Sequence, residues 1–349
     1  MTLGAYTRLE IDSQPSVWQA TLDDIAAQQG QLSSALAGLS TAPLIVTGCG
    51  STYYLSLHAA AVLRKIGVQA WALPASELVY FAQEHRPRRF NLLAVSRSGT
   101  TTETVRAVEG YRAAHPQGTA IAITCAPETP LTAHADASLV AAHAPEQSVA
   151  QTRSFTSMAL LAQALAGLVA GNPARLTRLR GLPAALAGLI EREPETPQQI
   201  GADLSIERLF FLGSGPLYGI ACEAMLKTKE MTCSWAEAYH VLEFRHGPMS
   251  LAGQGALVVG LISDSAAEAE IKVLHDMRQL GARTLALAEA RGSYDWIGVD
   301  QVIELHSGLD EWERGALYLP LLQWIAFHRA LAKGLDPDRP VNLTAVVYL

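Results

Sequence analysis

A hydroxyl-rich stretch in the first third of the chain has the residue types of an anion site. Residues 92–95 form an apolar run with the length of a buried strand, and SRSGTTT follows before a helical pattern opens at Glu103. A strand that leads through a small loop into a helix N-terminus favours anions, because unpaired N–H groups and the helix dipole meet there. The hydroxyls and the one guanidinium that can donate to phosphate oxygens are those of Ser96, Ser98, Thr100, Thr101, Thr102, Thr104 and Arg97. The stretch indicates a phosphate site; an ordinary capped turn is the alternative.

A second set of chemical groups lies on the helix predicted over residues 217–232. Glu223 and Lys227 are four residues apart and Lys227 and Glu230 are three apart, so all three share one face. From spacing alone, the favoured interpretation is a solvated ladder of ion pairs. His246 precedes Gly247-Pro248, which places it on a loop, where an imidazole can shuttle protons or merely face solvent.

The strands and helices that must position these groups form a pattern that occurs twice along the chain. Strands alternate with helices in both halves, which predicts parallel sheets covered on both faces. Residues of the first half recur in the second at an offset of 165, so that Gly48 and Gly50 correspond to Gly213 and Gly215. We therefore predict an α/β fold of two tandem lobes, each a three-layer, flavodoxin-like or Rossmann-like sandwich of one parallel sheet flanked by helices. The lobes differ, because Asp264 stands in the second copy of the hydroxyl loop and would repel phosphate.

The predicted boundaries follow this repeat. Residues 1–43 are predicted to form an N-terminal helical segment, 44–171 a first, phosphate-binding lobe, 172–199 a helical connector and 200–349 a second, catalytic lobe.

Composition excludes several classes of function. The chain has 349 residues and a formal charge of −7, which argues against a nucleic-acid partner. Its four cysteines lack disulfide or zinc spacing, and no signal peptide or membrane span is visible, so a cytoplasmic setting is expected. Gly48-Cys49-Gly50 has Tyr53 where a dinucleotide fingerprint needs a third glycine, and neither a cofactor nor a metal is predicted.

A series of short motifs runs through nearly the whole chain, from EIDSQP at Glu10 to PVNL at Pro340. The motifs between these ends are residues 48–52, 75–77, 96–104, 149–155, 223–230, 236–239 and 243–248. In this order along the chain they resemble sugar isomerase (SIS) domains and, more closely, the isomerase half of glucosamine-6-phosphate synthase.

The resemblance implies a role for each residue that matches a family motif. It implies a sugar-phosphate cradle, in which Arg97 replaces the glutamine usual in the synthase, formed by Ser51, Thr52, Ser96, Arg97, Ser98 and Thr101. It implies that Val149 and Gln151 touch the sugar, that Glu230 moves a proton between C1 and C2, and that Lys227 helps to hold the sugar. His246 aligns with a ring-opening histidine that reaches the neighbouring subunit's site, which implies a homodimer with a shared active site.

Two departures from the synthase are visible. The sequence starts at Met1 in the isomerase region, so we expect no glutaminase domain and no built-in ammonia source. Ala345 stands where the synthase has the lysine that forms a Schiff base with fructose 6-phosphate, so covalent capture of the ketose by that route is lost.

Three functions are compatible with these residues. The first is a metal-free amino-sugar-phosphate deaminase with coupled isomerisation, most simply glucosamine-6-phosphate deaminase, in which Lys227 favours the ionised form of Glu230. The second is a plain aldose–ketose phosphosugar isomerase, or a deglycase acting on sugar–amine adducts. The third is a non-catalytic phosphosugar sensor, although no DNA-binding appendage is visible.

Overall fold

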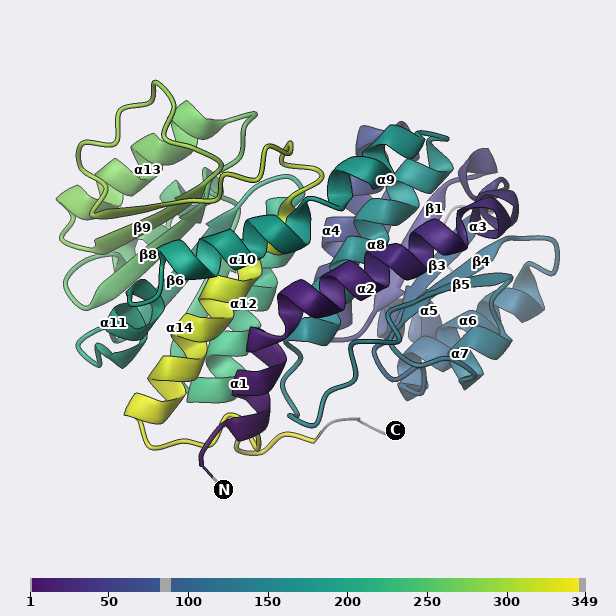
Figure 1. Cartoon of the computed structure of the whole chain (residues 1–349), viewed down its shortest axis with the longest axis horizontal. Helices are drawn as coiled ribbons and strands as arrows, with labels where there is room; N and C mark the ends of the chain where they lie inside the picture. Colours follow the sequence, from purple (N-terminus) through teal and green to yellow (C-terminus); the bar gives the residue numbers. More distant parts are fainter. Residues whose placement is uncertain (1, 82–88, 345–349) are drawn as a thin grey trace. The chain divides into compact units, whose positions relative to one another are not determined.

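The computed structural model describes residues 2–81 and 89–344, so Ala345 lies outside the described residues. The chain forms two compact units that interleave along the sequence (Figure 1). The first unit is built mainly from Ser16–Glu146 and Arg153–Gly181, and the second from Met1–Pro15, Gln147–Thr152 and Leu182–Leu343. The domain boundaries drawn from the sequence remain a prediction.

The first unit contains a five-stranded parallel sheet of order β2-β1-β3-β4-β5. Its strands are β1 (Leu44–Gly48), β2 (Ala70–Pro74), β3 (Asn91–Val95), β4 (Ala120–Thr124) and β5 (Ala137–Val140). Every residue of β1, β3 and β4 is buried, which explains why these strands are continuous apolar runs.

Helices cover both faces of this sheet. The helices of this unit are α2 (Gln14–Ala27), α3 (Gln29–Leu36), α4 (Ser51–Lys65), α5 (Ala75–Tyr80), α6 (Thr102–Ala114), α7 (Pro130–Ala133), α8 (Arg153–Val169) and α9 (Pro173–Leu179). Helices α4 and α8 pack on each other and on the sheet, whereas α5, α6 and α7 form a second group over the core around Leu92 and Val108. Nearly all of α8 is buried, as expected for an apolar core helix.

The second unit repeats this plan with a parallel sheet of order β10-β9-β8-β6-β7. Its strands are β6 (Arg208–Gly213), β7 (Trp235–Tyr239), β8 (Ala256–Leu261), β9 (Arg283–Ala288) and β10 (Gln301–Glu304). The helices are α1 (Ala5–Asp12), α10 (Leu182–Arg192), α11 (Thr196–Ala202), α12 (Leu217–Thr232), α13 (Ala267–Gln279) and α14 (Leu319–Ala332). Helix α12 packs on β6 and β7 and against α14, while α13 packs on β8 and β9.

The two sheets have the same topology, which confirms the predicted fold class. In each sheet the lobe's first strand, β1 or β6, is the second strand from one edge. The lobe's second strand, β2 or β7, forms that edge, and the later strands follow in chain order on the other side. Gly48 and Gly213 are required at equivalent points, because a Cβ would lie 2.7 Å from the Thr52 carbonyl in one lobe and 2.5 Å from the Leu217 carbonyl in the other.

The fixed offset of 165 is wrong by one residue in places. The N–H of Ser96 bonds to the carbonyl of Ile123, and that of Ile262 to Leu287, so these positions correspond at offsets of 166 (262 − 96) and 164 (287 − 123). Loops of unequal length therefore shift the register while the strands keep their pairing.

No helix within residues 2–81 and 89–344 is long and apolar enough to cross a membrane.

Candidate active site

The hydroxyl loop lies at the carboxyl end of β3 and leads into α6. The buried Ser96 Oγ accepts the N–H of Gly99 at 3.1 Å and lies 3.2 Å from Thr101 Oγ1. The Ser98 Oγ accepts the N–H of Thr100 at 3.2 Å and its hydroxyl at 2.9 Å. Gly99 has φ 65°, and a Cβ there would lie 2.1 Å from Thr129. The serines thus hold the loop in a fixed shape, in which Ser96 lies beside Thr101 and Ser98 beside Thr100.

The start of α6 keeps the properties of an anion site. Thr101 is the N-cap residue, and among the described residues its side chain makes no capping bond to the helix. Helix α6 has 13 residues, which is long enough to carry a dipole with its positive end at this loop.

A second loop of the first unit, between β1 and α4, holds Ser51 and Thr52. Both side chains are buried, and Thr52 Oγ1 donates to the Cys49 carbonyl and accepts the Cys49 N–H, each at 2.9 Å. Thr104 Oγ1 lies 3.5 Å from Cys49 Sγ, which connects this loop to α6. Burial raises the pKa of the Cys49 thiol, so this cysteine stays protonated and is a poor nucleophile. Through its two hydrogen bonds with the Cys49 backbone, the Thr52 hydroxyl stabilises the turn in which it lies.

Arg97 is held by a carboxylate that the sequence did not indicate. Its Nη1 lies 3.5 Å from Oε2 of Glu146, whose side chain is fully buried while that of Arg97 is 15% exposed. Glu146 also accepts the backbone N–H of Ser154 at 3.1 Å, together with its hydroxyl, at the start of α8. Glu146 could have been suspected only from its place directly before the motif at residues 149–155.

The three charged residues that share one face of α12 are largely removed from solvent. Lys227 Nζ lies 3.3 Å from Glu223 Oε1 and also contacts Glu230 Oε2. The side chains of Glu223 and Lys227 are 0% and 1% exposed, whereas that of Glu230 is 19% exposed. The solvated ladder favoured by spacing is therefore wrong, because this face of α12 packs toward the sheet and α14. A buried lysine between two carboxylates is costly unless fully paired, which is typical of a functional group.

The 147–152 segment of the second unit carries Val149 and Gln151. Glu10 of α1 fixes it, since the Glu10 carboxylate accepts the N–H groups of Gln147 and Ser148 at 2.6 and 3.2 Å. Ala150 packs in one apolar cluster with Met231, the residue after Glu230. The segment therefore lies beside α12.

Val149 and Gln151 of this segment differ in their hydrogen bonding. The Val149 N–H donates to the Asp338 carbonyl at 3.3 Å, and the Asp338 carboxylate accepts the Thr7 N–H at 2.7 Å, so residues near both ends of the chain support it. Within the described part of the chain, the buried side-chain oxygen of Gln151 has no hydrogen-bond partner. Glu10 and Asp338 are positioning residues that sequence reasoning missed, because their partners are distant in sequence.

His246 lies between two 3₁₀ turns, Glu243–Arg245 and Pro248–Leu251, and its side chain is exposed. Gly247 has φ 125°, a positive value that allows the chain to turn directly after the histidine. The imidazole is thus presented on the surface of the second unit.

The predicted site residues divide between the units. Those of the proposed cradle lie in the first unit: Ser51, Thr52, Ser96, Arg97, Ser98 and Thr101. Those that would contact the sugar or move protons lie in the second: Val149, Gln151, Lys227, Glu230 and His246.

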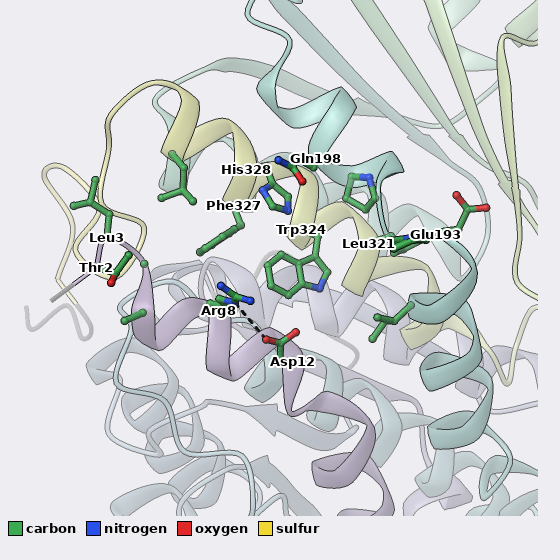
Figure 2. Close-up of a pocket in the computed structure, with 16 residues that line it drawn as sticks. Thr2, Leu3, Arg8, Asp12, Glu193, Gln198, Leu321, Trp324, Phe327 and His328 are labelled. Atoms are coloured by element: carbon green, nitrogen blue, oxygen red, sulfur yellow. Dashed lines mark ion pairs between the residues drawn. The ribbon is translucent and has the colours of Figure 1, made fainter.

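A cavity of about 720 Å³ in the second unit is lined by other residues (Figure 2). Arg8 and Asp12 on α1 face Trp324 and Phe327 on α14 across it. The rings of Trp324 and His328 are stacked, with their centroids 5.5 Å apart. Burial lowers the pKa of His328. None of the predicted site residues lines this cavity.

With this geometry established, comparison with known proteins identifies the first lobe. Residues 42–168 match the SIS domain family. Residues 42–168 are an SIS domain. The sequence is 29% identical to glutamine–fructose-6-phosphate aminotransferase [isomerizing] of Sulfurisphaera tokodaii over 97% of this chain and 55% of that protein. The chain spans about half the length of the curated relatives it matches.

Solved structures with this domain cover nearly the whole chain. Tagatose-6-phosphate ketose/aldose isomerase from Escherichia coli has a TM-score of 0.86 and 26% identity, with 96% of this chain and 95% of that chain covered. Glucosamine-6-phosphate deaminase from Thermotoga maritima has a TM-score of 0.73 and 25% identity, covering 94% and 99%. The SIS resemblance drawn from the sequence is confirmed, and the chain has the fold of phosphosugar-isomerase-type SIS proteins.

Proposed function

We propose that this chain converts glucosamine 6-phosphate and water into fructose 6-phosphate and ammonia. The observation that carries the proposal is the buried lysine of α12 between two carboxylates, one of which, Glu230, is partly exposed. The similarity to the Thermotoga maritima glucosamine-6-phosphate deaminase over nearly the full length supports this choice of substrate.

Phosphate binding is assigned to the hydroxyl loop. Ser98 and Thr101 lie in a loop whose shape is set by internal hydrogen bonds, so little reorganisation is needed when donors turn to phosphate. The N-terminus of α6 favours the negative charge. Fixing the phosphate orients the sugar, which makes the later proton transfers effectively intramolecular.

Proton transfer is assigned to Glu230. After His246 assists ring opening, the Glu230 carboxylate removes the C2 proton of the open-chain aldose, giving an enolamine, and returns the proton to C1. Lys227 holds Glu230 in place through their contact. Gln151, whose side-chain oxygen accepts no bond from the described residues, can accept a sugar hydroxyl.

The last step is hydrolysis. Proton return leaves a C2 ketimine, to which water adds; the C–N bond then breaks, ammonia leaves and the C2 ketone of fructose 6-phosphate forms. Atoms balance with one water consumed, and no oxidant or reductant is needed. Because Ala345 provides no amine, covalent capture of the ketose by the lysine route of the synthase is lost.

A plain aldose–ketose isomerase is the second candidate, favoured by the similarity to the Escherichia coli tagatose-6-phosphate isomerase. It would use the same residues on a substrate that carries a C2 hydroxyl. In either case we propose a sugar phosphate as the ligand and a homodimer in which the exposed His246 serves the partner subunit's site.

The test supplies the purified protein with glucosamine 6-phosphate and measures ammonia and fructose 6-phosphate. Release of both in equal amounts supports the deaminase. Interconversion of glucose, galactose or tagatose 6-phosphate with its partner sugar, without ammonia from the amino sugar, would support the isomerase instead. Tight phosphosugar binding without any turnover would contradict both and favour a sensor.

A further inference from the structure

The carboxylate of Glu146 joins two parts of the first unit, the hydroxyl loop and the start of α8. It lies 3.5 Å from the Arg97 guanidinium and accepts two hydrogen bonds from Ser154 at the start of α8. Its side chain is fully buried, whereas neighbouring Gln147 is exposed. A buried carboxylate at this position does more than cap a helix, since it also forms an ion pair with Arg97 of the hydroxyl loop.

The charge at the loop follows from this contact. A guanidinium alone would give the loop a full positive charge beside the proposed phosphate. With Glu146 at ion-pair distance, its carboxylate offsets part of the Arg97 charge, so the phosphate meets hydroxyls, backbone N–H groups and a partly compensated arginine. Arg153 is a further cation near this pair, and its guanidinium donates to the Pro145 carbonyl at 2.9 Å.

We propose that Glu146 is a positioning residue that holds Arg97 in the phosphate loop and offsets its charge, thereby weakening phosphosugar binding so that product can leave. The inference rests on the proposed function, because it takes the hydroxyl loop as the phosphate site. It adds a determinant of affinity that lies outside the loop itself.

The sign of the expected effect separates this role from a merely structural one. In Glu146→Gln the amide can still accept the Ser154 N–H and donate to its hydroxyl, so the cap is kept while the charge is removed. A charge role predicts tighter binding of a phosphate dianion, whereas a purely structural role predicts weaker binding and lower stability.

Calorimetry with fructose 6-phosphate, at low and high salt, tests the proposal on the full chain. We expect Glu146→Gln to bind about tenfold more tightly than wild type, the size expected for one charge removed several ångströms away. The salt dependence should steepen, because the uncompensated arginine is screened by ions.

Two controls match this variant. Ser154→Ala removes one hydrogen bond to Glu146 but keeps its charge, so affinity should stay near wild type. Asp136→Asn removes an equal charge from the Arg112 ion pair at the amino end of β4, away from the loop, and should also leave affinity unchanged.

The outcomes are distinct. Binding by wild type with equal or weaker binding by Glu146→Gln would overturn the inference alone. Tightening by Asp136→Asn to the same extent would also overturn it, because the effect would then reflect net charge. Absence of binding by wild type and variant alike would overturn the proposed function and the inference with it.

Discussion

The two lobes carry the same loop with different contents. In the first, the Gly99 N–H donates to Ser96 Oγ at 3.1 Å; in the second, the Ala266 N–H donates to Ser263 Oγ at 3.1 Å. Each loop follows a central strand and leads into a 13-residue helix. In both loops a serine hydroxyl thus accepts the N–H three residues later, although Ser263 lies one position further along its loop than Ser96 in the strand register.

The loops differ in the acceptors of their backbone N–H groups, which in the second loop include carboxylates. The N–H groups of Asp264 and Ser265 donate to Glu311 at 2.5 and 3.0 Å, and that of Ser263 donates to Glu270 at 2.7 Å. The second loop therefore supplies its own anions. The second lobe therefore shows that this turn geometry accepts negative charge, which internal carboxylates supply there.

Asp264 has a role that the sequence could not indicate. It was expected only to repel phosphate, but its carboxylate binds the buried Arg314 guanidinium at 2.5 and 2.8 Å. Glu289 lies 3.5 Å from the same arginine. The residue that departs from the first loop is thus part of a structural network at the end of the second sheet.

The largest expected effect separates chemistry from binding. Glu230→Gln should lower kcat by about a thousandfold, because the amide cannot accept a proton, while affinity for fructose 6-phosphate is kept. Steady-state rates and calorimetry measure the two. The control Glu237→Gln alters a partly exposed carboxylate that pairs with Lys229 and should leave the rate near wild type. Near-normal turnover by Glu230→Gln would remove it from the mechanism.

The next effect compares the two loops directly. Ser96→Ala with Ser98→Ala should weaken phosphosugar binding about a hundredfold, since two lost donors contribute roughly 1.4 kcal/mol each. The matched pair Ser263→Ala and Ser265→Ala should leave affinity within about twofold of wild type. Equal losses in both double variants, measured by calorimetry, would contradict the distinction between the loops.

A smaller effect concerns the stability of the second loop. Glu311 is 2% exposed and accepts the Ser265 hydroxyl as well as two backbone N–H groups. Glu311→Ala should lower the free energy of unfolding by about 2 kcal/mol, because the loop donors lose their acceptor. Urea unfolding measures this, with exposed Glu268→Ala as the control. An unchanged midpoint would show that water replaces the carboxylate at no cost.

The smallest effect depends on pH. Burial raises the pKa of Glu270 above its ordinary 4.5, and Glu311 adds to the rise. A carboxyl whose folded pKa is raised costs stability as pH rises from below 4.5 through the raised value. Glu270→Gln lacks this loss, so the stability of the variant relative to wild type should increase from acid to neutral pH. A constant difference across urea titrations at several pH values would contradict the assignment.

The fold was predictable because its signals are local. Buried strands such as β3 are apolar runs, and Gly48 and Gly213 mark the same close approach in both lobes. The burial of Lys227 was not predictable, because residues three and four apart share a face whether that face meets water or the sheet. The contacts of Glu146 with Arg97 depend on tertiary structure and leave no periodic signal.

The proposed deamination is tested most directly by following glucosamine 6-phosphate by proton NMR in the presence of wild-type protein and of Glu230→Gln. With wild type we expect the anomeric signals to decay and those of fructose 6-phosphate to grow, whereas the variant should bind the sugar and leave it intact. Unchanged signals with wild type, at concentrations where calorimetry shows binding, would contradict the proposed deamination.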